Sequence, residues 1–99
     1  MLIDFVNTVK RLTDRQIELG DSSNTLFFDM MEEIGEASSA LAIENGSVSK
    51  KHKILKESAK EEFVDVIQCA LAVYFSLGGD VDHLESYGAK KNKKWSGLL

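Results

Sequence analysis

Residues 27–41 read FFDMMEEIGEASSAL and are predicted to form the helix around which the chain is organised. Glu33 and Glu36 stand three positions apart in this stretch, so they lie about one turn apart on the same face of a helix. A second acidic pair with the same spacing, Glu62 and Asp65, follows further along the chain. What the chain can do therefore depends on whether the two pairs meet in space.

Two helices are predicted in the first half of the chain. The first covers residues 2–19, where apolar residues recur every three to four positions, and Gly20 ends it. The second contains the quoted stretch and runs to about Glu44, because Asn45 and Gly46 are typical helix-ending residues. Its predicted core stripe is Phe27, Met30, Ile34, Ala37 and Leu41.

Two further helices are predicted after a polar, basic connection over residues 47–56. Ser58 and Glu61 match a capping box, so the third helix begins there and continues to Leu77, before a pair of glycines. Asp80 can cap the fourth helix, whose apolar positions are Val81, Leu84 and Tyr87. Four helices with short connections predict an all-α, four-helix bundle that forms one domain over residues 1–99.

The composition limits the class of protein. A chain of 99 residues builds only a modest core, so helices from a second copy would help to complete it. The net charge of -4 disfavours nucleic-acid binding. Cys69 is the only cysteine, which indicates a reducing compartment. The first ten residues do not resemble a signal peptide, and the longest apolar run, residues 63–75, is short for a membrane span. We therefore expect a cytoplasmic protein without a membrane partner.

The acidic side chains are predicted to flank the core. On the second helix, Glu33 falls at the edge of the apolar stripe, and Asp29 and Glu36 fall just beyond it on the same side. On the third helix, Asp65 and Gln68 are the only polar side chains between residues 63 and 75, apart from the cysteine thiol. A helix that is apolar nearly all round is usually buried, so Asp65 should be largely desolvated.

Several carboxylates that share a buried site repel one another unless a cation joins them. A hard divalent cation with oxygen ligands resolves both the repulsion and the cost of burial. The alternatives are a solvated acidic face and ion pairs with Lys56 or Lys60. A ferritin-like site is disfavoured because Asp80-x-x-His83 lacks its glutamate, and no EF-hand loop is present. His52, in the lysine-rich connection, is expected to be solvated.

The acidic motifs resemble a known family. EEIGE at residues 32–36, followed by EEFVD at residues 61–65, resembles the MazG-like nucleotide pyrophosphohydrolases, whose signature is Glu-x-x-Glu, a spacer and Glu-x-x-Asp. The similarity extends to KKNKKW at residues 90–95, since members often carry a basic segment with an asparagine after the last helix. The resemblance thus covers roughly residues 24–95.

The resemblance implies an all-α fold whose subunits pair as homodimers or homotetramers. It also implies hydrolysis of a nucleoside triphosphate, either ribo or deoxy, to the monophosphate and pyrophosphate. Mg²⁺, with Mn²⁺ as a substitute, would be held by the residues at the motif positions, which are Glu33, Glu36, Glu62 and Asp65. Glu32, Glu61 and Asp29 have no assigned role. The expected phosphate and base contacts are Lys91, Asn92, Lys94 and Trp95.

Two other interpretations stay open at the level of sequence. The chain could be a non-catalytic helical dimerisation or regulatory module that keeps the MazG-like fold. It could also be a helical adaptor that holds its acids in ion pairs with lysines. The sequence gives no indication of base or sugar preference, and it leaves Phe27, Phe28 and Tyr74 as candidates for either core packing or a base pocket.

Overall fold

The computed structural model describes residues 1–46 and 57–99, and within them the chain forms four α-helices and no strand. The helices are α1 (Leu2–Glu18), α2 (Ser23–Glu44), α3 (Ala59–Ser76) and α4 (Val81–Leu98). The predicted all-α class and the order of the helices are therefore confirmed. The predicted connection over residues 47–56, with His52 and Lys56, lies outside the described residues.

Side-chain caps define where three of the helices begin. Ser22 accepts a backbone hydrogen bond at the start of α2. Ser58 and Glu61 form the predicted capping box of α3, and Asp80 accepts a hydrogen bond of 2.7 Å from the His83 amide at the start of α4. These caps satisfy amide groups that have no partner inside the helix, which is why short polar residues at these positions located the boundaries.

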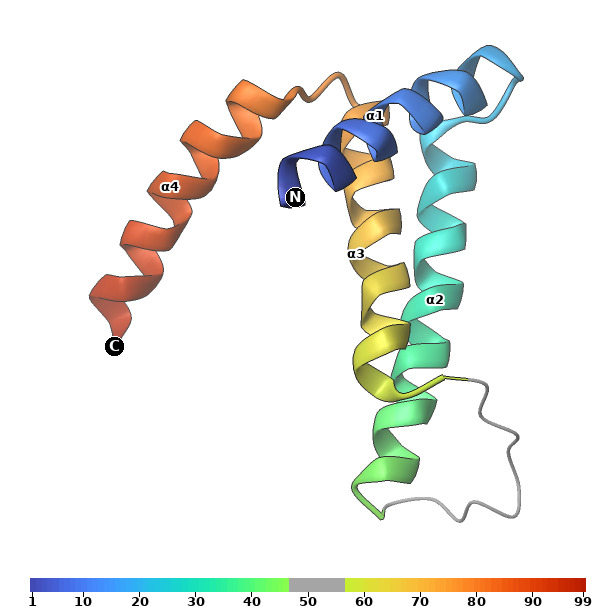
Figure 1. Cartoon of the computed structure of the whole chain (residues 1–99), viewed down its shortest axis with the longest axis vertical. Helices are drawn as coiled ribbons and strands as arrows, with labels where there is room; N and C mark the ends of the chain where they lie inside the picture. The colour runs from blue at the N-terminus through green and yellow to red at the C-terminus, as the bar shows by residue number, and fades with distance from the viewer. Residues whose placement is uncertain (47–56) are drawn as a thin grey trace.

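The core lies where α1, α2 and α3 meet. In Figure 1, α2 and α3 run antiparallel side by side, and α1 crosses them near the start of α2 and the end of α3. The α2–α3 contact is built on small residues, because Ala37, Ala40 and Ala59 are buried. Val9, Leu26, Ile43 and Phe75 complete the buried apolar set, and the buried Thr13 donates to the Val9 carbonyl at 2.8 Å.

The predicted core stripe of α2 is confirmed at Ala37 but is otherwise rotated about the helix axis. Phe27, Ile34 and Leu41 are 40%, 36% and 46% exposed, whereas the other buried positions of the helix are Leu26, Ala40 and Ile43. The cause is that α2 carries two apolar stripes, and spacing alone does not say which one packs within the chain. The consequence is that Glu33 lies on the packed side of the helix and not only at its edge.

The prediction that α3 is buried all round is also wrong. Phe63, Val64 and Ile67 are 40%, 49% and 53% exposed. These three side chains, together with the outer stripe of α2, leave an apolar surface uncovered. Asp65, in contrast, is half-buried, which is less than the near-complete desolvation that the sequence predicted for it but in the same direction.

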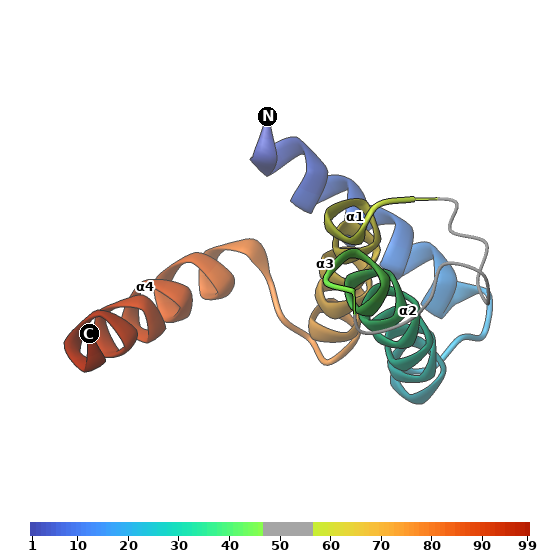
Figure 2. The ribbon, with the colours of Figure 1, turned by 90° about the horizontal axis from the view of Figure 1, so that it is seen from below.

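The chain does not close a four-helix bundle by itself, because α4 extends away from the other helices in both Figure 1 and Figure 2. None of its residues is buried. The radius of gyration is 15.9 Å, compared with about 13 Å for a compact chain of this length. Within one copy, three helices pack together and α4 projects, so the four-helix bundle completed by a second copy stays a prediction.

The direction of α4 is set by contacts at the corner after α3. The Tyr74 hydroxyl lies 3.1 Å from the Asp80 carbonyl and 2.5 Å from His83 Nδ1. The Tyr74 ring lies so close to Gly79 that a β-carbon at that position would collide with it. His83 stacks on Tyr74 and on Tyr87, with ring centroids 5.9 Å and 5.4 Å apart. These contacts hold the start of α4 against the end of α3.

In the part of the chain that the structure describes, no single helix is long and apolar enough to cross a membrane. Only α3 and α4 taken together have that length and composition, and they are bent by 114° at their junction.

Candidate metal centre

The antiparallel packing of α2 and α3 brings the two acidic pairs together. One carboxylate oxygen from each of Glu33, Glu62 and Asp65 lies within 4.8 Å of the others. All three residues are half-buried. The meeting of the two pairs, on which the sequence-based hypothesis depended, is therefore present for three of the four predicted ligands.

Glu33 is the most constrained of these carboxylates. Its Oε2 atom is buried and has no hydrogen-bond partner. The pKa of Glu33 is raised from 4.5 to about 7, first by burial and then by the charges of Glu36 and Asp65, a hydrogen bond with the Glu36 carboxyl and the charge of Glu62. A buried oxygen without a partner is unfavourable, and either a proton or a bound cation would satisfy it.

The pKa of Glu62 is shifted in the same direction as that of Glu33. Desolvation raises its pKa above the ordinary value, followed by the charges of Glu57, Glu36 and Asp65 and then that of its neighbour Glu61. Glu61 itself is used elsewhere, because its hydrogen bonds to Ser58 lower its pKa and cap α3. Of the two adjacent glutamates on α3, Glu62 therefore belongs to the cluster and Glu61 to the cap.

No lysine or arginine neutralises the cluster within residues 1–46 and 57–99. The ion pairs found there join Met1 to Asp4, Lys10 to Asp14 and Arg15 to Glu18, all on α1. The alternative of a pair with Lys60 is thus not realised, and Lys56 lies outside the described residues.

Glu36, the fourth predicted ligand, lies at the rim of the cluster. It is exposed and is not one of the three converging residues, although its charge acts on both Glu33 and Glu62. Glu32 and Asp29 are also exposed, so they stay secondary to the cluster. Glu36 is therefore accessible from solvent, and its charge still raises the pKa of Glu33 and of Glu62.

The residues present fit a hard divalent cation. The converging donors are all carboxylate oxygens, which Mg²⁺, Mn²⁺ and Ca²⁺ prefer. The unpartnered Glu33 Oε2 and the absence of a protein cation in the described residues both leave room for an ion. Glu33, Glu62 and Asp65 would hold that ion, with Glu36 beside it.

The basic end of α4 does not meet the acids within one copy of the chain. Lys91, Asn92, Lys94 and Trp95 are exposed on the outer half of α4, which projects away from α2 and α3 in both ribbon views (Figures 1 and 2). Lys91 lies over the Tyr87 ring, with its Nζ atom 5.4 Å from the ring centroid. Any phosphate contact by these residues requires α4 from another copy or a different position of α4.

A small cavity, which the sequence did not predict, adjoins the acidic cluster where α1, α2 and α3 meet. Its volume is about 160 Å³. Its lining combines apolar side chains with a few polar ones and consists of Val9, Leu12, Thr13, Gln16, Leu26, Asp29, Gln68, Cys69 and Ala72. The one hint of this cavity in the sequence was Gln68, which is, with Asp65, one of the two polar side chains in the apolar stretch of α3. Phe27, Phe28 and Tyr74, the suggested pocket residues, do not line this cavity.

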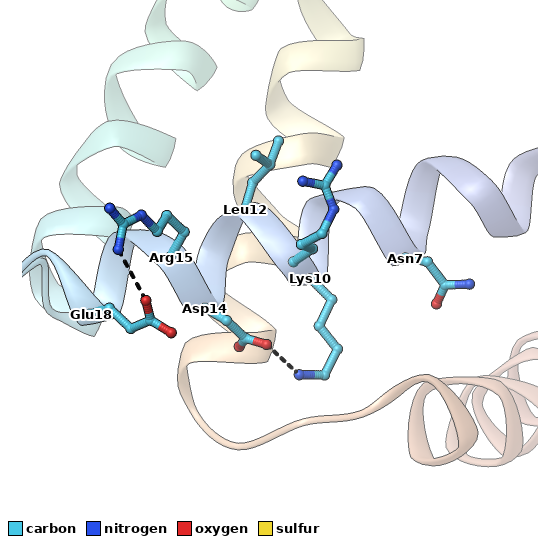
Figure 3. A pocket seen from close by; sticks show the side chains of 7 residues that line it. Asn7, Lys10, Leu12, Asp14, Arg15 and Glu18 are labelled. Carbon is cyan, nitrogen blue, oxygen red and sulfur yellow. Dashed lines mark hydrogen bonds and ion pairs between the residues drawn. The ribbon is translucent and has the colours of Figure 1, made fainter.

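A wider hollow of about 600 Å³ lies along α1 alone, and Figure 3 shows its charged lining. The ion pairs Lys10–Asp14 and Arg15–Glu18 there span 3.0 Å and 3.1 Å. Exposed pairs of this kind contribute only about 0–1 kcal/mol and are common on helix surfaces. This hollow contains none of the clustered acids, so we assign it no role in the site.

No family model matches the chain, and no curated protein or solved structure matches it either.

Proposed function

We propose that this chain is a Mg²⁺-dependent nucleoside triphosphate pyrophosphohydrolase of the MazG-like kind. The observation that carries the proposal is the convergence of Glu33, Glu62 and Asp65, with a buried Glu33 oxygen that has no partner. The order of the acidic motifs along the sequence supports the same conclusion. Three half-buried carboxylates that lie together repel one another, and a bound cation would relieve that repulsion.

Each carboxylate has a role in the proposed reaction. Glu33, Glu62 and Asp65 would hold the cation, which when bound neutralises phosphate charge and activates water. Glu36, at the exposed rim, would orient the attacking water and accept its proton at a carboxylate oxygen. The water oxygen forms a bond to the α-phosphorus, and the bond from that phosphorus to the bridging oxygen breaks. The bridging oxygen keeps the electron pair and leaves as part of pyrophosphate.

Self-association would cover the apolar surface that one copy leaves exposed and would bring the basic end of α4 to the acidic cluster. The uncovered apolar surface consists of Phe27, Phe28, Met31, Ile34 and Leu41 on α2 and Phe63, Val64 and Ile67 on α3. Exposed apolar side chains gathered on two packed helices are typical of an interface. The projecting α4, with no buried residue, needs tertiary contacts to be stable, since helical stability in proteins comes mostly from packing. We infer that α4 of a second copy covers this surface and brings Lys91 and Lys94 towards the acids.

Sedimentation checks this part of the proposal. The wild-type protein is expected to sediment as a dimer or tetramer at micromolar concentration. Ile67→Lys, which places a charge in the apolar surface, is expected to shift it towards the monomer. Asn7→Lys, at an exposed position on α1, is the matched control and should leave the assembly unchanged. A monomeric wild-type protein at every concentration contradicts the inference.

The reaction itself is tested by incubating the purified protein with Mg²⁺ and a panel of ribo- and deoxynucleoside triphosphates. Release of pyrophosphate from at least one nucleotide, abolished by chelation of the metal, is the expected result. If every nucleotide stays intact while Mg²⁺ still raises the melting temperature, the non-catalytic helical module is the better description. If Mg²⁺ also has no effect, the metal site is wrong as well.

A further inference from the structure

We propose that Glu44 is a positioning residue for the acidic cluster, because its hydrogen bond to the Ala59 amide sets the position of α3 along α2. This inference rests on the proposed function for the identity of the cluster as a metal centre. It adds a residue outside the cluster that fixes how far Glu62 and Asp65 lie from Glu33.

Glu44 is the last residue of α2, and its carboxylate links this helix to the first turn of α3. Its Oε2 atom accepts a hydrogen bond of 3.0 Å from the backbone N–H of Ala59. Ala59 is the first residue of α3, so this N–H has no acceptor inside its own helix. Because Ala59 is only 6% exposed, loss of the Glu44 carboxylate would leave the donor sheltered from water and unpaired.

Neighbouring donors at the start of α3 find their acceptors within the same turn. The Ser58 N–H donates to Glu61 Oε1 at 3.3 Å, and the Glu61 N–H donates to Ser58 Oγ at 3.4 Å. The Glu62 N–H donates to the Ser58 carbonyl at 3.0 Å. These bonds shape the helix end but do not place it. The bond from Ala59 to Glu44 reaches a different helix, so it bears on where α3 begins relative to α2.

The apolar contact between α2 and α3 defines this position less sharply. Its buried residues include Ala37, Ala40 and Ala59, whose side chains are single methyl groups. Packed helices are held in place by side-chain ridges that fit into grooves, and methyl groups form only shallow ridges. A hydrogen bond, in contrast, is directional and keeps its two atoms about 2.7–3.2 Å apart. The bond between Glu44 and Ala59 therefore restricts a sliding movement that the alanines permit.

A second polar contact lies at the opposite end of the helix pair. The Ser23 hydroxyl oxygen, at the start of α2, lies 2.9 Å from the Ser76 hydroxyl oxygen and 3.5 Å from the Ser76 carbonyl oxygen at the end of α3. The acidic cluster lies between this contact and the one at Glu44. The two helices are thus tied by hydrogen bonds on both sides of the cluster.

The contact at Glu44 is the nearer of the two to the cluster along α3. Glu62 follows Ala59 by three residues, or about 4.5 Å along the helix axis, whereas Ser76 follows Asp65 by eleven residues, or about 16 Å. A metal site requires its ligands to stay within about 0.5 Å of the productive geometry. A small displacement of the first turn of α3 is therefore enough to weaken the site.

Titration with Mn²⁺ by calorimetry measures the effect on the cluster. Glu44→Ala is expected to weaken Mn²⁺ binding by about 10–100-fold, the range for loss of a residue that orients a metal ligand. Glu44→Gln keeps an oxygen that can accept the Ala59 N–H and removes the charge. It is expected to bind Mn²⁺ within about fivefold of the wild-type protein, the size of effect expected from one exposed charge.

Two control variants separate positioning from charge and from stability. Glu57→Gln removes an exposed charge that acts directly on Glu62, and it should change Mn²⁺ affinity by about fivefold at most. Ser22→Ala removes the side-chain cap of α2, at the far end of the helix pair. It should lower the melting temperature and leave Mn²⁺ affinity unchanged.

Amide NMR spectra of the metal-free protein test the position of α3 without the ion. A helix moves largely as a unit, so Glu44→Ala is expected to shift the amide signals along α3 as far as Asp65. Glu44→Gln is expected to leave the signals of Glu62 and Asp65 in place.

The possible outcomes are distinct. Wild-type Mn²⁺ affinity in Glu44→Ala overturns the inference, and so does an equal loss of affinity in Glu44→Gln, Glu57→Gln or Ser22→Ala. NMR shifts in Glu44→Ala that stay within the first turn of α3 also overturn it. If the wild-type protein binds no Mn²⁺ but the shifts reach Asp65 and glutamine prevents them, the role of Glu44 is supported and the metal centre is refuted. The two failures are therefore distinguishable.

Discussion

Replacement of Asp65 by asparagine is expected to abolish pyrophosphate release while the helical circular dichroism signal stays intact. The substitution keeps the shape of the side chain and removes its charge. Mg²⁺ in a carboxylate site depends on that charge, because the ion gives up bound water reluctantly. Loss of residues that merely orient a metal ligand costs about 10–100-fold. Loss of a ligand itself should therefore lower kcat/KM by more than about a hundredfold.

Two further substitutions sharpen this result. Glu36→Gln at the rim of the cluster should lower kcat and leave Mg²⁺ affinity nearly unchanged, since Glu36 is proposed to act on water and not to hold the ion. Glu32→Gln is the control, because Glu32 is an exposed neighbour on the same helix, outside the converging three residues. Turnover by Asp65→Asn at the wild-type rate would show that the acids serve another purpose.

Replacement of Glu33 by glutamine is expected to stabilise the metal-free protein. In its folded state Glu33 has a pKa raised to about 7 from 4.5. The folded protein therefore binds more protons than the unfolded chain between these values, and the unfolding free energy falls as the pH rises. The stability that the protonated group contributes is fully present below pH 4.5 and is lost as the pH rises through about 7. Glutamine resembles the protonated form at every pH.

The size of this effect follows from the shift. Each pKa unit corresponds to about 1.4 kcal/mol, so the wild-type protein should lose on the order of 1–3 kcal/mol at pH 8 relative to the variant. For a domain of this size that corresponds to a melting temperature roughly 5–15 °C lower. The difference should shrink as the pH falls and disappear below pH 4.5, where Glu33 is protonated in both the folded and the unfolded states. Thermal melts of the two proteins in chelator across this pH range make the measurement, with Glu32→Gln as the control.

If Glu33→Gln stabilises the protein at pH 8, the wild-type carboxylate lowers the stability of the fold, as expected of a side chain that serves a function. If Glu33→Gln instead destabilised the protein at pH 8 without metal, the carboxylate would have a favourable partner, and the site as described would be wrong.

Local chemistry made the helix boundaries predictable from the sequence. The caps of α3 and α4 are formed by Ser58 with Glu61 and by Asp80. Each cap involves residues within a single helical turn, so the helix boundary does not depend on distant contacts. The sequence left open whether Glu33 meets Glu62 and Asp65, and it is the antiparallel packing of α2 against α3 that brings these carboxylates together.

Longer-range features were not predictable for identifiable reasons. The rotation of α2 depended on a choice between two apolar stripes that share Ala37, and the stripe that also contains Leu26 and Ala40 is the one that is buried. The projection of α4 depends on the packing of Tyr74 against Gly79 and His83, which no periodicity encodes. The cavity near Gln68 arises only where three helices meet.

Titration of the purified protein with Mg²⁺ or Mn²⁺ by calorimetry tests the metal centre most directly. The wild-type protein is expected to show saturable binding that Glu33→Gln and Asp65→Asn abolish and that Glu32→Gln leaves unchanged. No saturable binding by the wild-type protein, or equal binding by all four proteins, would contradict the assignment of Glu33, Glu62 and Asp65 as the ligands.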